Sequence, residues 1–374
     1  MPNSVHGTIL TTDDVDIGTW DFATETFTAG GASPNAVHVT TRRDTTNSNP
    51  LATNFLRIIG LRDLNVIADS IAIKGISQCH NAGLIAGRDV SQTTKNGFYE
   101  NICVHGVEGM SLTNDNFYEL GVQTSTTCKD CVGPQDLESI IASNTGFAEA
   151  WDLGGEGYEL RPENAYIAGQ IISTLKALPD VASYDDMLAT YGDEYAPWSY
   201  LFNGSARPAR VTGSSLPATL VPFTVYDITC TGNLTLPETP IRNVAIVSDC
   251  RIHDTPSGTL DIQDAVLAVD QLQQINNHGI SIAANGDIGQ ADCSAGLEIY
   301  TNDTSVNFAA KGDVNNVRIV SAGDVTWATG ANARVGISVE ALRDIKITTD
   351  SDFGLCPDGS GPPGPRQFEY ALVR

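Results

Sequence analysis

The chain has 374 residues, more than one compact core usually holds, and 41% of them are apolar, which is enough for folded domains. Asp and Glu number 45 against 21 Lys and Arg, so the formal net charge is −24. A chain this acidic repels nucleic acid and anionic lipid headgroups, which argues against both as partners. No long apolar run exists, so the sequence predicts no membrane span, and the polar residues after Met1 do not resemble a signal peptide.

Residues 1–75 have the pattern of a small α/β unit. The alternation in Ala36–Thr41 is typical of a strand. Leu51–Leu61 has apolar residues at helical spacing and a Gly near its end, which predicts a short helix. Leu64–Ile73 is rich in β-branched residues and predicts a second strand.

Short apolar pieces alternate with Gly and Asn in residues 76–125, and the pattern returns more strongly in 225–356. Matched hairpins would need longer strands, whereas the coils of a β-helix need short strands joined by tight turns. We therefore predict a mainly β fold, a right-handed β-helix or solenoid that includes both segments. An immunoglobulin-like sandwich is the alternative.

A Gly-Asp motif followed by a β-branched residue recurs in the second segment, at Gly286–Ile288, Gly312–Val314 and Gly323–Val325. The spacing is irregular, 26 and then 11 residues, so the repeat is weak. We expect Gly to supply a corner of positive φ and Asp to form a hydrogen bond within its own turn. The three Asp residues could stack on one face of the coils as a catalytic group, but their position in the motif favours a role as turn residues.

Residues 126–204 interrupt the pattern with helical periodicity and are predicted to be a helical insertion. A linker over 205–224 follows it, and a Pro/Gly tail with a last strand occupies 357–374. Large aromatic side chains crowd the insertion, where they form either its small core or an exposed patch for a partner. The candidate partner-binding residues are Trp151, Tyr158, Trp198, Tyr200 and Phe202.

Eight cysteines are spread along the chain, and only one C-x-x-C pair occurs among them. Zinc would need a second close pair or histidines at ligand spacing, so disulfides in an oxidising compartment are the better interpretation. We predict four local bonds, Cys79–Cys103, Cys128–Cys131, Cys230–Cys250 and Cys293–Cys356.

The sequence contains no nucleophile elbow, zinc-protease motif or phosphate-binding loop, so we expect no enzyme and no catalytic residues. Some acidic clusters suit Ca²⁺, although solvated loops are the more common explanation. We therefore expect no cofactor, and Ca²⁺ is the one candidate ion. The weak candidate ligands are Asp13, Asp14, Asp16, Asp350 and Asp352. The alternative function is a carbohydrate-active β-helix enzyme, a lyase or hydrolase with paired carboxylates, or a carbohydrate-binding module.

The stretch Gly18–Arg43 resembles the TadG-like proteins of bacterial Tad (tight adherence) pilus systems, of the alphaproteobacterial type. The regions Cys79–Gly121 and Val225–Cys356 are similar to later parts of such proteins. The resemblance implies a structural or adhesive protein of the periplasm, cell surface or pilus, with other pilus or minor-pilin-like proteins as partners and surface polysaccharide as a further candidate. Such proteins normally begin with a membrane-spanning segment, so we expect a trimmed chain or another route of anchoring.

Overall fold

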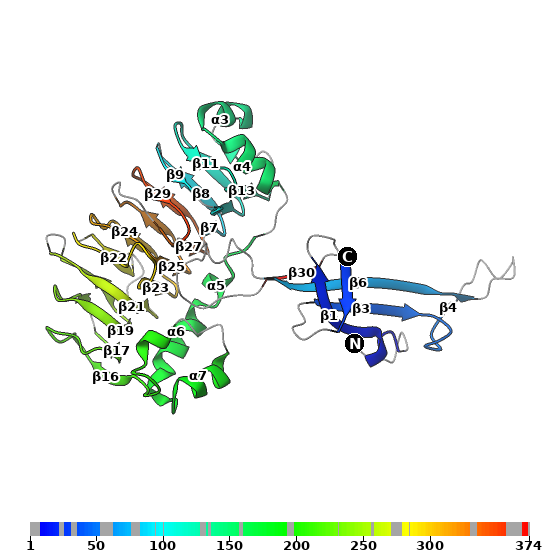
Figure 1. The fold of residues 1–374 in the computed structure, drawn as a ribbon, viewed down its shortest axis with the longest axis horizontal. Helices are drawn as coiled ribbons and strands as arrows, with labels where there is room; N and C mark the ends of the chain where they lie inside the picture. Colours follow the sequence, from blue (N-terminus) through cyan, green and yellow to red (C-terminus); the bar gives the residue numbers. More distant parts are fainter. Residues whose placement is uncertain are drawn as a thin grey trace. The chain divides into compact units, whose positions relative to one another are not determined.

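The fold is described from a computed structural model, which divides the chain into two compact units (Figure 1). The small unit comprises Met1–Ser77 and Phe368–Arg374, and the large unit comprises Gln78–Gln367. The structure describes residues 8–21, 26–30, 36–52, 63–75, 83–93, 95–99, 101–127, 132–133, 136–156, 160–192, 198–230, 232–255, 258–270, 279–283, 285–329, 335–356 and 369–372.

The small unit is an antiparallel sheet of five strands. In spatial order they are β2 (Thr26–Ala29), β1 (Val15–Asp21), β3 (Ala36–Arg43), β6 (Val66–Gly75) and β30 (Glu369–Leu372). A short pair of strands and one 3-10 helix complete its described elements, namely β4 (Leu51–Ala52), β5 (Asp63–Leu64) and η1 (Thr12–Asp14).

The predicted strands of the small unit are present, and the last strand of the chain joins them. β30 pairs with β6 although the whole large unit separates the two in sequence. The helix predicted over Leu51–Leu61 is not seen where the structure describes it, since Leu51 and Ala52 form β4 and residues 53–61 lie outside the described residues. The described part of this unit is therefore β rather than α/β.

The large unit is built on three parallel sheets, which confirms a mainly β fold. The 11-stranded sheet runs in the order β15 (Gly155–Glu156), β13 (Gln123–Thr126), β10 (Cys103–Gly106), β7 (Gly83–Ala86), β27 (Ile337–Ala341), β25 (Val317–Ser321), β23 (Leu297–Thr301), β21 (Ile262–Val269), β19 (Ile241–Ser248), β17 (Thr224–Ile228) and β16 (Ala209–Gly213). The 9-stranded sheet runs in the order β14 (Val132–Gly133), β11 (Gly109–Leu112), β8 (Asp89–Gln92), β28 (Ile345–Ile347), β26 (Val325–Trp327), β24 (Val306–Phe308), β22 (Ile280–Ile282), β20 (Arg251–His253) and β18 (Asn233–Thr235). The 3-stranded sheet runs in the order β12 (Phe117–Tyr118), β9 (Gly97–Phe98) and β29 (Asp352–Phe353).

The chain visits the sheets in turn, from β7 to β8 to β9 and then from β10 to β11 to β12. Residues at equivalent places on successive coils are hydrogen-bonded 20 positions apart: the Asn96 side chain donates to the Asn116 side chain, and the Asp344 backbone N–H donates to the Asp324 carboxylate. Paired residues lie 20 positions apart in several coils, as at Cys103 and Gly83, and the spacing widens to 32 positions where Ala265 pairs with Leu297, so the irregular motif spacing reflects coils of different length.

The last coil lies beside the first. β27 pairs with β7, β28 with β8 and β29 with β9, so the segments on both sides of the helical insertion share all three sheets. Part of the segment predicted to be a linker is also a strand, since β16 pairs with β17 at the end of the 11-stranded sheet. The β-branched Val211 and Thr212 favour this strand despite the Pro- and Ser-rich sequence around it.

Aromatic rings form a continuous row inside the stack, because equivalent inward positions of successive coils face each other. The ring of Phe308 stacks on Trp327, Trp327 contacts Phe353, and Phe353 stacks on Phe98. The row continues from Phe98 through Tyr118, Phe147 and Trp151. All of these residues belong to one buried cluster, so the two coil segments share one core.

The helical insertion contacts the stack in two places. At one end, α4 (Phe147–Gly154) follows α3 (Leu137–Ser143) and packs against β13. The α3 helix begins at Asp136, whose carboxylate accepts a hydrogen bond from the Ser139 backbone N–H. The remaining elements are α5 (Glu163–Tyr166), α6 (Ala168–Ala177), η3 (Leu178–Asp180) and α7 (Tyr184–Tyr191). Figure 1 shows α6 beside the 11-stranded sheet, where it packs against β17, β19 and β23.

The Gly-Asp motifs occupy two different corners of the coils. Asp287 and Asp313 are neighbours, since Ile288 forms a bridge with Val314. Asp324 lies elsewhere, beside Asp344, whose backbone N–H it accepts at 3.2 Å. The three Asp residues therefore do not form one stack. The expected bond within the turn is not the one made at Asp324, whose carboxylate accepts a hydrogen bond from the next coil.

Candidate functional site

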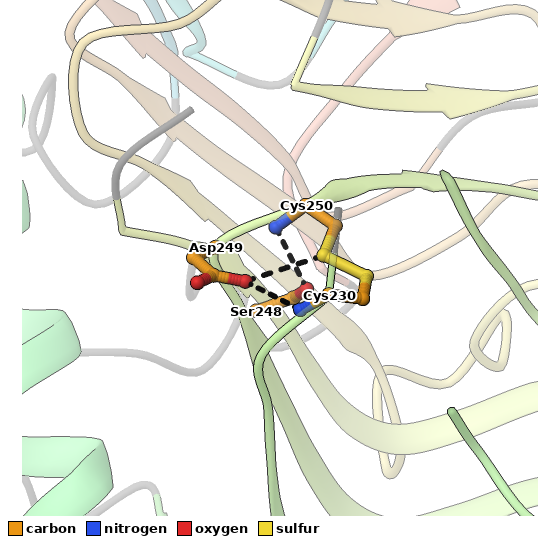
Figure 2. Close-up of a disulfide and its surroundings, with 4 residues drawn as sticks. All are labelled: Cys230, Ser248, Asp249 and Cys250. Atoms are coloured by element: carbon orange, nitrogen blue, oxygen red, sulfur yellow. Dashed lines mark hydrogen bonds between the residues drawn. A yellow bond between two sulfur atoms is a disulfide. The ribbon is translucent and has the colours of Figure 1, made fainter. Parts of the chain in front are cut away.

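A disulfide joins two successive coils at one corner of the large unit. Cys230 and Cys250 follow the paired strands β17 and β19, in which Ile228 lies beside Ser248. Figure 2 shows Asp249 turned toward the bond, where its Oδ1 accepts the Cys230 backbone N–H at 3.0 Å and lies 3.2 Å from Cys250 Sγ. The hydroxyl of Ser248 accepts the Cys250 backbone N–H at 3.0 Å. This corner fixes the spacing of two coils.

The predicted bond Cys293–Cys356 is also present and ties the end of the coil region back to an earlier turn. Cys103 takes part in a disulfide too, and its partner lies outside the described residues. The predicted partners Cys79, Cys128 and Cys131 are among the residues that the structure does not describe. No described cysteine is free.

The same corner forms the one group of three metal-ligating side chains found among the described residues, Cys230, Asp249 and Cys250. The two sulfurs are bonded to each other, so they are not metal ligands in this oxidation state. The weak Ca²⁺ candidates Asp13, Asp14, Asp16, Asp350 and Asp352 belong to no such group. The Asp14 carboxylate instead forms an ion pair with Arg42, with 2.8 Å between Asp14 Oδ1 and Arg42 Nε.

The candidate partner-binding aromatics are mostly buried. Trp198 and Phe202 lie in the cluster between the insertion and the 11-stranded sheet, and Trp151 lies in the main core. Tyr200 donates its hydroxyl to the Glu298 carboxylate at 2.7 Å, and Tyr158 lies outside the described residues. The structure thus supports the first of the two interpretations for Trp151, Trp198 and Phe202, a core rather than an exposed patch.

Glu298 is at the centre of a polar network buried beneath the insertion. It is 1% exposed and accepts hydrogen bonds from Trp198 Nε1 at 2.9 Å, Tyr200 Oη at 2.7 Å and Tyr300 Oη at 2.5 Å. Burial raises the pKa of the Glu298 carboxyl, although these three donors and the nearby Arg318 oppose the rise. The network joins the loop before β16 to strand β23.

Arg318 and Glu340 extend this network along the sheet. Each is 1% exposed, and Arg318 Nη2 lies 3.4 Å from Glu340 Oε1. Glu340 also accepts the Asn164 backbone N–H at 3.0 Å and its side-chain amide at 2.5 Å, so it anchors the start of α5. Among the described residues, Arg318 Nε and Nη1 have no hydrogen-bond partner. Removing one partner of a buried ion pair is costly, so these contacts hold the insertion at one position on the sheet.

Glu298, Arg318 and Glu340 were not among the candidate site residues predicted from the sequence. They alternate with apolar residues in their strands, and such alternation normally indicates a water-exposed face. The 20-residue spacing of these three strands, combined with an insertion long enough to cover the sheet, was the signal that could have found them.

A row of carboxylates lies at the beginning of three neighbouring strands of the 9-stranded sheet: Asp324 precedes β26, Asp344 precedes β28 and Asp89 begins β8. Asp344 Oδ1 accepts a hydrogen bond from the Asp89 backbone N–H at 3.4 Å, and Asp324 Oδ1 accepts one from the Asp344 backbone N–H in the same way. Arg88 Nε lies 3.7 Å from both Asp344 and Glu108, and burial and these acids raise the pKa of Asp89. The row therefore combines carboxylates and a guanidinium on one edge of the coils.

His105 and Ser125 form a buried pair on adjacent strands, with 2.7 Å between His105 Nδ1 and Ser125 Oγ. His105 is 0% exposed and Ser125 3%, so a substrate cannot reach the hydroxyl. A serine beside a histidine has the composition of a catalytic nucleophile with its base, but catalysis requires that the substrate reach the nucleophile.

These features define a class of protein: a mainly β chain whose large unit is a stack of parallel strands, cross-linked by disulfides and covered on one face by docked helices. The chain belongs to the family described as "Domain of unknown function (DUF7867)", which matches residues 83–357. Its N-terminal part, residues 2–72, matches a second family, described as "Putative Tad-like Flp pilus-assembly", which makes it a Tad-related protein.

No curated protein and no solved structure matches the chain. Within the described residues, no helix is long and apolar enough to cross a membrane.

Proposed function

We propose that this protein is a non-enzymatic structural or adhesive component of a Tad-type pilus or of the cell surface. One observation carries the proposal: a Tad-like pilus-assembly region, residues 2–72, forms the small unit, and the DUF7867 region forms the large one. The small unit would connect the protein to other pilus or minor-pilin-like proteins. The large unit would serve as a rigid stalk or display surface.

The stack is best explained as a right-handed β-helix. Its strands pass from sheet to sheet in order and pair in parallel, and the chain returns to the 11-stranded sheet after 20 residues in most coils and after 32 in the longest. Parallel crossover connections are right-handed in nearly all proteins. A β-helix is long, stiff and rich in backbone hydrogen bonds, properties that suit an exposed structural part.

The same features support an extracytoplasmic location and a non-catalytic role. Disulfides persist in oxidising compartments, and described cysteines from three parts of the chain are bonded. The polar groups that catalysis could use, such as His105 with Ser125 and Glu298 with Arg318, are buried and serve packing. No cofactor is needed for such a role, and the TadG-like proteins of alphaproteobacteria are the specific relatives we propose.

The experiment is made in the source bacterium with an epitope-tagged copy at the native locus. Chemical cross-linking followed by mass spectrometry is expected to recover Tad pilus proteins with the tagged chain. Deletion of the gene is expected to lower the number of pili seen by electron microscopy or the adhesion of cells to a surface. Unchanged pili and adhesion, with no pilus protein enriched over an untagged strain, would contradict the proposal.

The row of Asp324, Asp344 and Asp89 with Arg88 keeps one alternative open, a β-helix enzyme acting on acidic polysaccharide. Incubation of the purified protein with polyuronic acids separates the two functions. Release of unsaturated or reducing sugar ends that disappears in Arg88→Ala would favour the enzyme.

A further inference from the structure

The two ends of the 11-stranded sheet are finished differently. At one end α4 packs against β13 and leads directly into the two-residue edge strand β15. At the other end the sheet stops at β16, and all five residues of Ala209–Gly213 are exposed. An open edge of this kind is a template for another strand.

The direction of the backbone groups in β16 follows from its bonds to β17. The N–H of Ala209 donates to Phe223, and the C=O of Gly213 accepts from Thr229. In a parallel ladder alternate residues face the same neighbour, so Val211 faces β17 as well. The N–H and C=O groups of Arg210 and Thr212 therefore point away from the sheet.

We propose that β16 is a self-association edge, at which a second copy of this chain pairs its own β16 antiparallel and in register about Val211. Val211 then lies opposite Val211 of the second copy as a non-hydrogen-bonded pair. Arg210 lies opposite Thr212 of the second copy, and each such pair exchanges two hydrogen bonds. The symmetry gives this arrangement twice, so all outward groups of both residues are used.

The charges of the edge fit this partner. Pairing about Val211 places no like charges directly opposite each other, because Arg210 meets Thr212. The Arg210 guanidinium is held by Asp180 Oδ2 at 2.7 Å on the helix side of the sheet, so it leaves the edge clear. Salt at physiological strength screens the repulsion between the two acidic chains beyond about 8 Å.

The length of the edge also fits a pairing of limited extent. Pro208 precedes the strand and has no N–H to offer at the next outward position. The pairing between the two copies is therefore limited to Arg210, Val211 and Thr212 of each β16 strand. A two-fold axis through Val211 uses this short segment completely and leaves no further edge for a third copy, which closes the assembly as a dimer.

Analytical ultracentrifugation of the full chain with its disulfides intact tests the proposal. The wild-type chain is expected to form a concentration-dependent dimer. Thr212→Pro removes an outward N–H without removing a bond to β17, so it should weaken dimerisation about tenfold or more. Thr212→Ala keeps the backbone donor and should dimerise within about twofold of the wild type. A chain that is monomeric at about 100 μM, or a Thr212→Pro variant that dimerises like the wild type, overturns the proposal.

A cysteine substitution tests the register independently. Non-hydrogen-bonded antiparallel pairs have Cα atoms about 4.5 Å apart, within the range that a disulfide spans. Val211→Cys should therefore form a covalent dimer under mild oxidation, with the 211–211 linkage identified by peptide mass spectrometry. Thr212→Cys, whose two copies are offset along the strands, should not form it. Equal cross-linking of both variants, or of neither, contradicts the register.

Discussion

The ring of Phe98, in the first coil of the large unit, stacks on the ring of Phe353 in its last coil, with centroids 5.4 Å apart and planes 9° apart. The contact lies where β9 pairs with β29. The two coil segments are thus joined at their interior as well as through their sheets.

Phe98→Ala should lower the free energy of unfolding of the large unit by about 3–5 kcal/mol, because it leaves a cavity between Phe353 and Tyr118. Phe98→Leu fills much of that space and should cost markedly less. Urea unfolding followed by tryptophan fluorescence measures both. Equal midpoints for Phe98→Ala and the wild type would show that this junction does not limit stability.

Asn116 connects three successive coils through its side chain. Its Oδ1 accepts both the backbone N–H and the side-chain amide of Asn96 at 3.0 Å, and its own amide donates to Asn144 Oδ1 at 3.0 Å. Asn116→Ala leaves these buried partners unsatisfied and should cost about 3 kcal/mol. Asn114→Ala, at an exposed position two residues away, should change stability by less than about 0.5 kcal/mol. Thermal unfolding of the two variants gives the comparison.

Glu298→Gln should destabilise the protein most at acidic pH. The amide replaces one carboxyl oxygen, which can accept a hydrogen bond in either protonation state, by an NH2 group that cannot accept from Trp198 or the tyrosine hydroxyls, which costs about 1–3 kcal/mol. Burial raises the pKa of Glu298 in the folded state, so its contribution is full below the unfolded pKa and is lost as the pH rises through the folded pKa. The cost of the substitution should therefore shrink as the pH rises above the ordinary Glu pKa of about 4.3.

Chemical denaturation at a series of rising pH values tests the trend, with Glu138→Gln on the exposed face of α3 as the control. The control difference should stay flat. A cost of Glu298→Gln that grows with pH would mean that the charged form is the one the fold stabilises.

Gly336→Ala should lower stability through the Cys293–Cys356 bond. Gly336 has φ of +66°, and a Cβ there would lie 2.6 Å from Cys356 Sγ and 2.7 Å from Cys293 Sγ. Backbone strain and the close approach together should cost about 1–3 kcal/mol. Gly133→Ala meets nothing within 4 Å and should stay within about 1 kcal/mol of the wild type by differential scanning calorimetry. If both variants melt at the wild-type temperature, the disulfide can move aside.

Local patterns predicted much of the large unit. Short strands bounded by Gly and Asn are strands in the structure, and the pair Cys230–Cys250 is bonded because 20 residues is one turn of the stack. The pairing of β27 with β7 depends on register across the whole unit, where the repeated motif was misleading because its copies occupy two corners. No local pattern carries that information.

The candidate site was harder to predict for a different reason. The side chains of Trp198 and Tyr200 find their partner, Glu298, on a strand far along the sequence. Considered separately in the sequence, the aromatic residues suggest an exposed binding surface, and the glutamate suggests a side chain in contact with solvent. Their contact in the fold explains why all of them can be buried. A buried carboxylate needs hydrogen-bond donors, and a buried indole N–H needs an acceptor.

The position of the first coil has a consequence for how the chain is made. β7 lies between β10, whose paired residues come 20 positions later in the chain, and β27. Gly87 donates its backbone N–H to Ala341 of that last coil. During synthesis, or during threading through a secretion channel, one flank of β7 has no neighbour until nearly the entire chain has emerged. Contacts so distant in sequence slow folding and leave an apolar edge open in the meantime. The nascent protein therefore needs its last coil before its first can be completed, and truncation just before residue 337 should damage the beginning of the stack as much as its end.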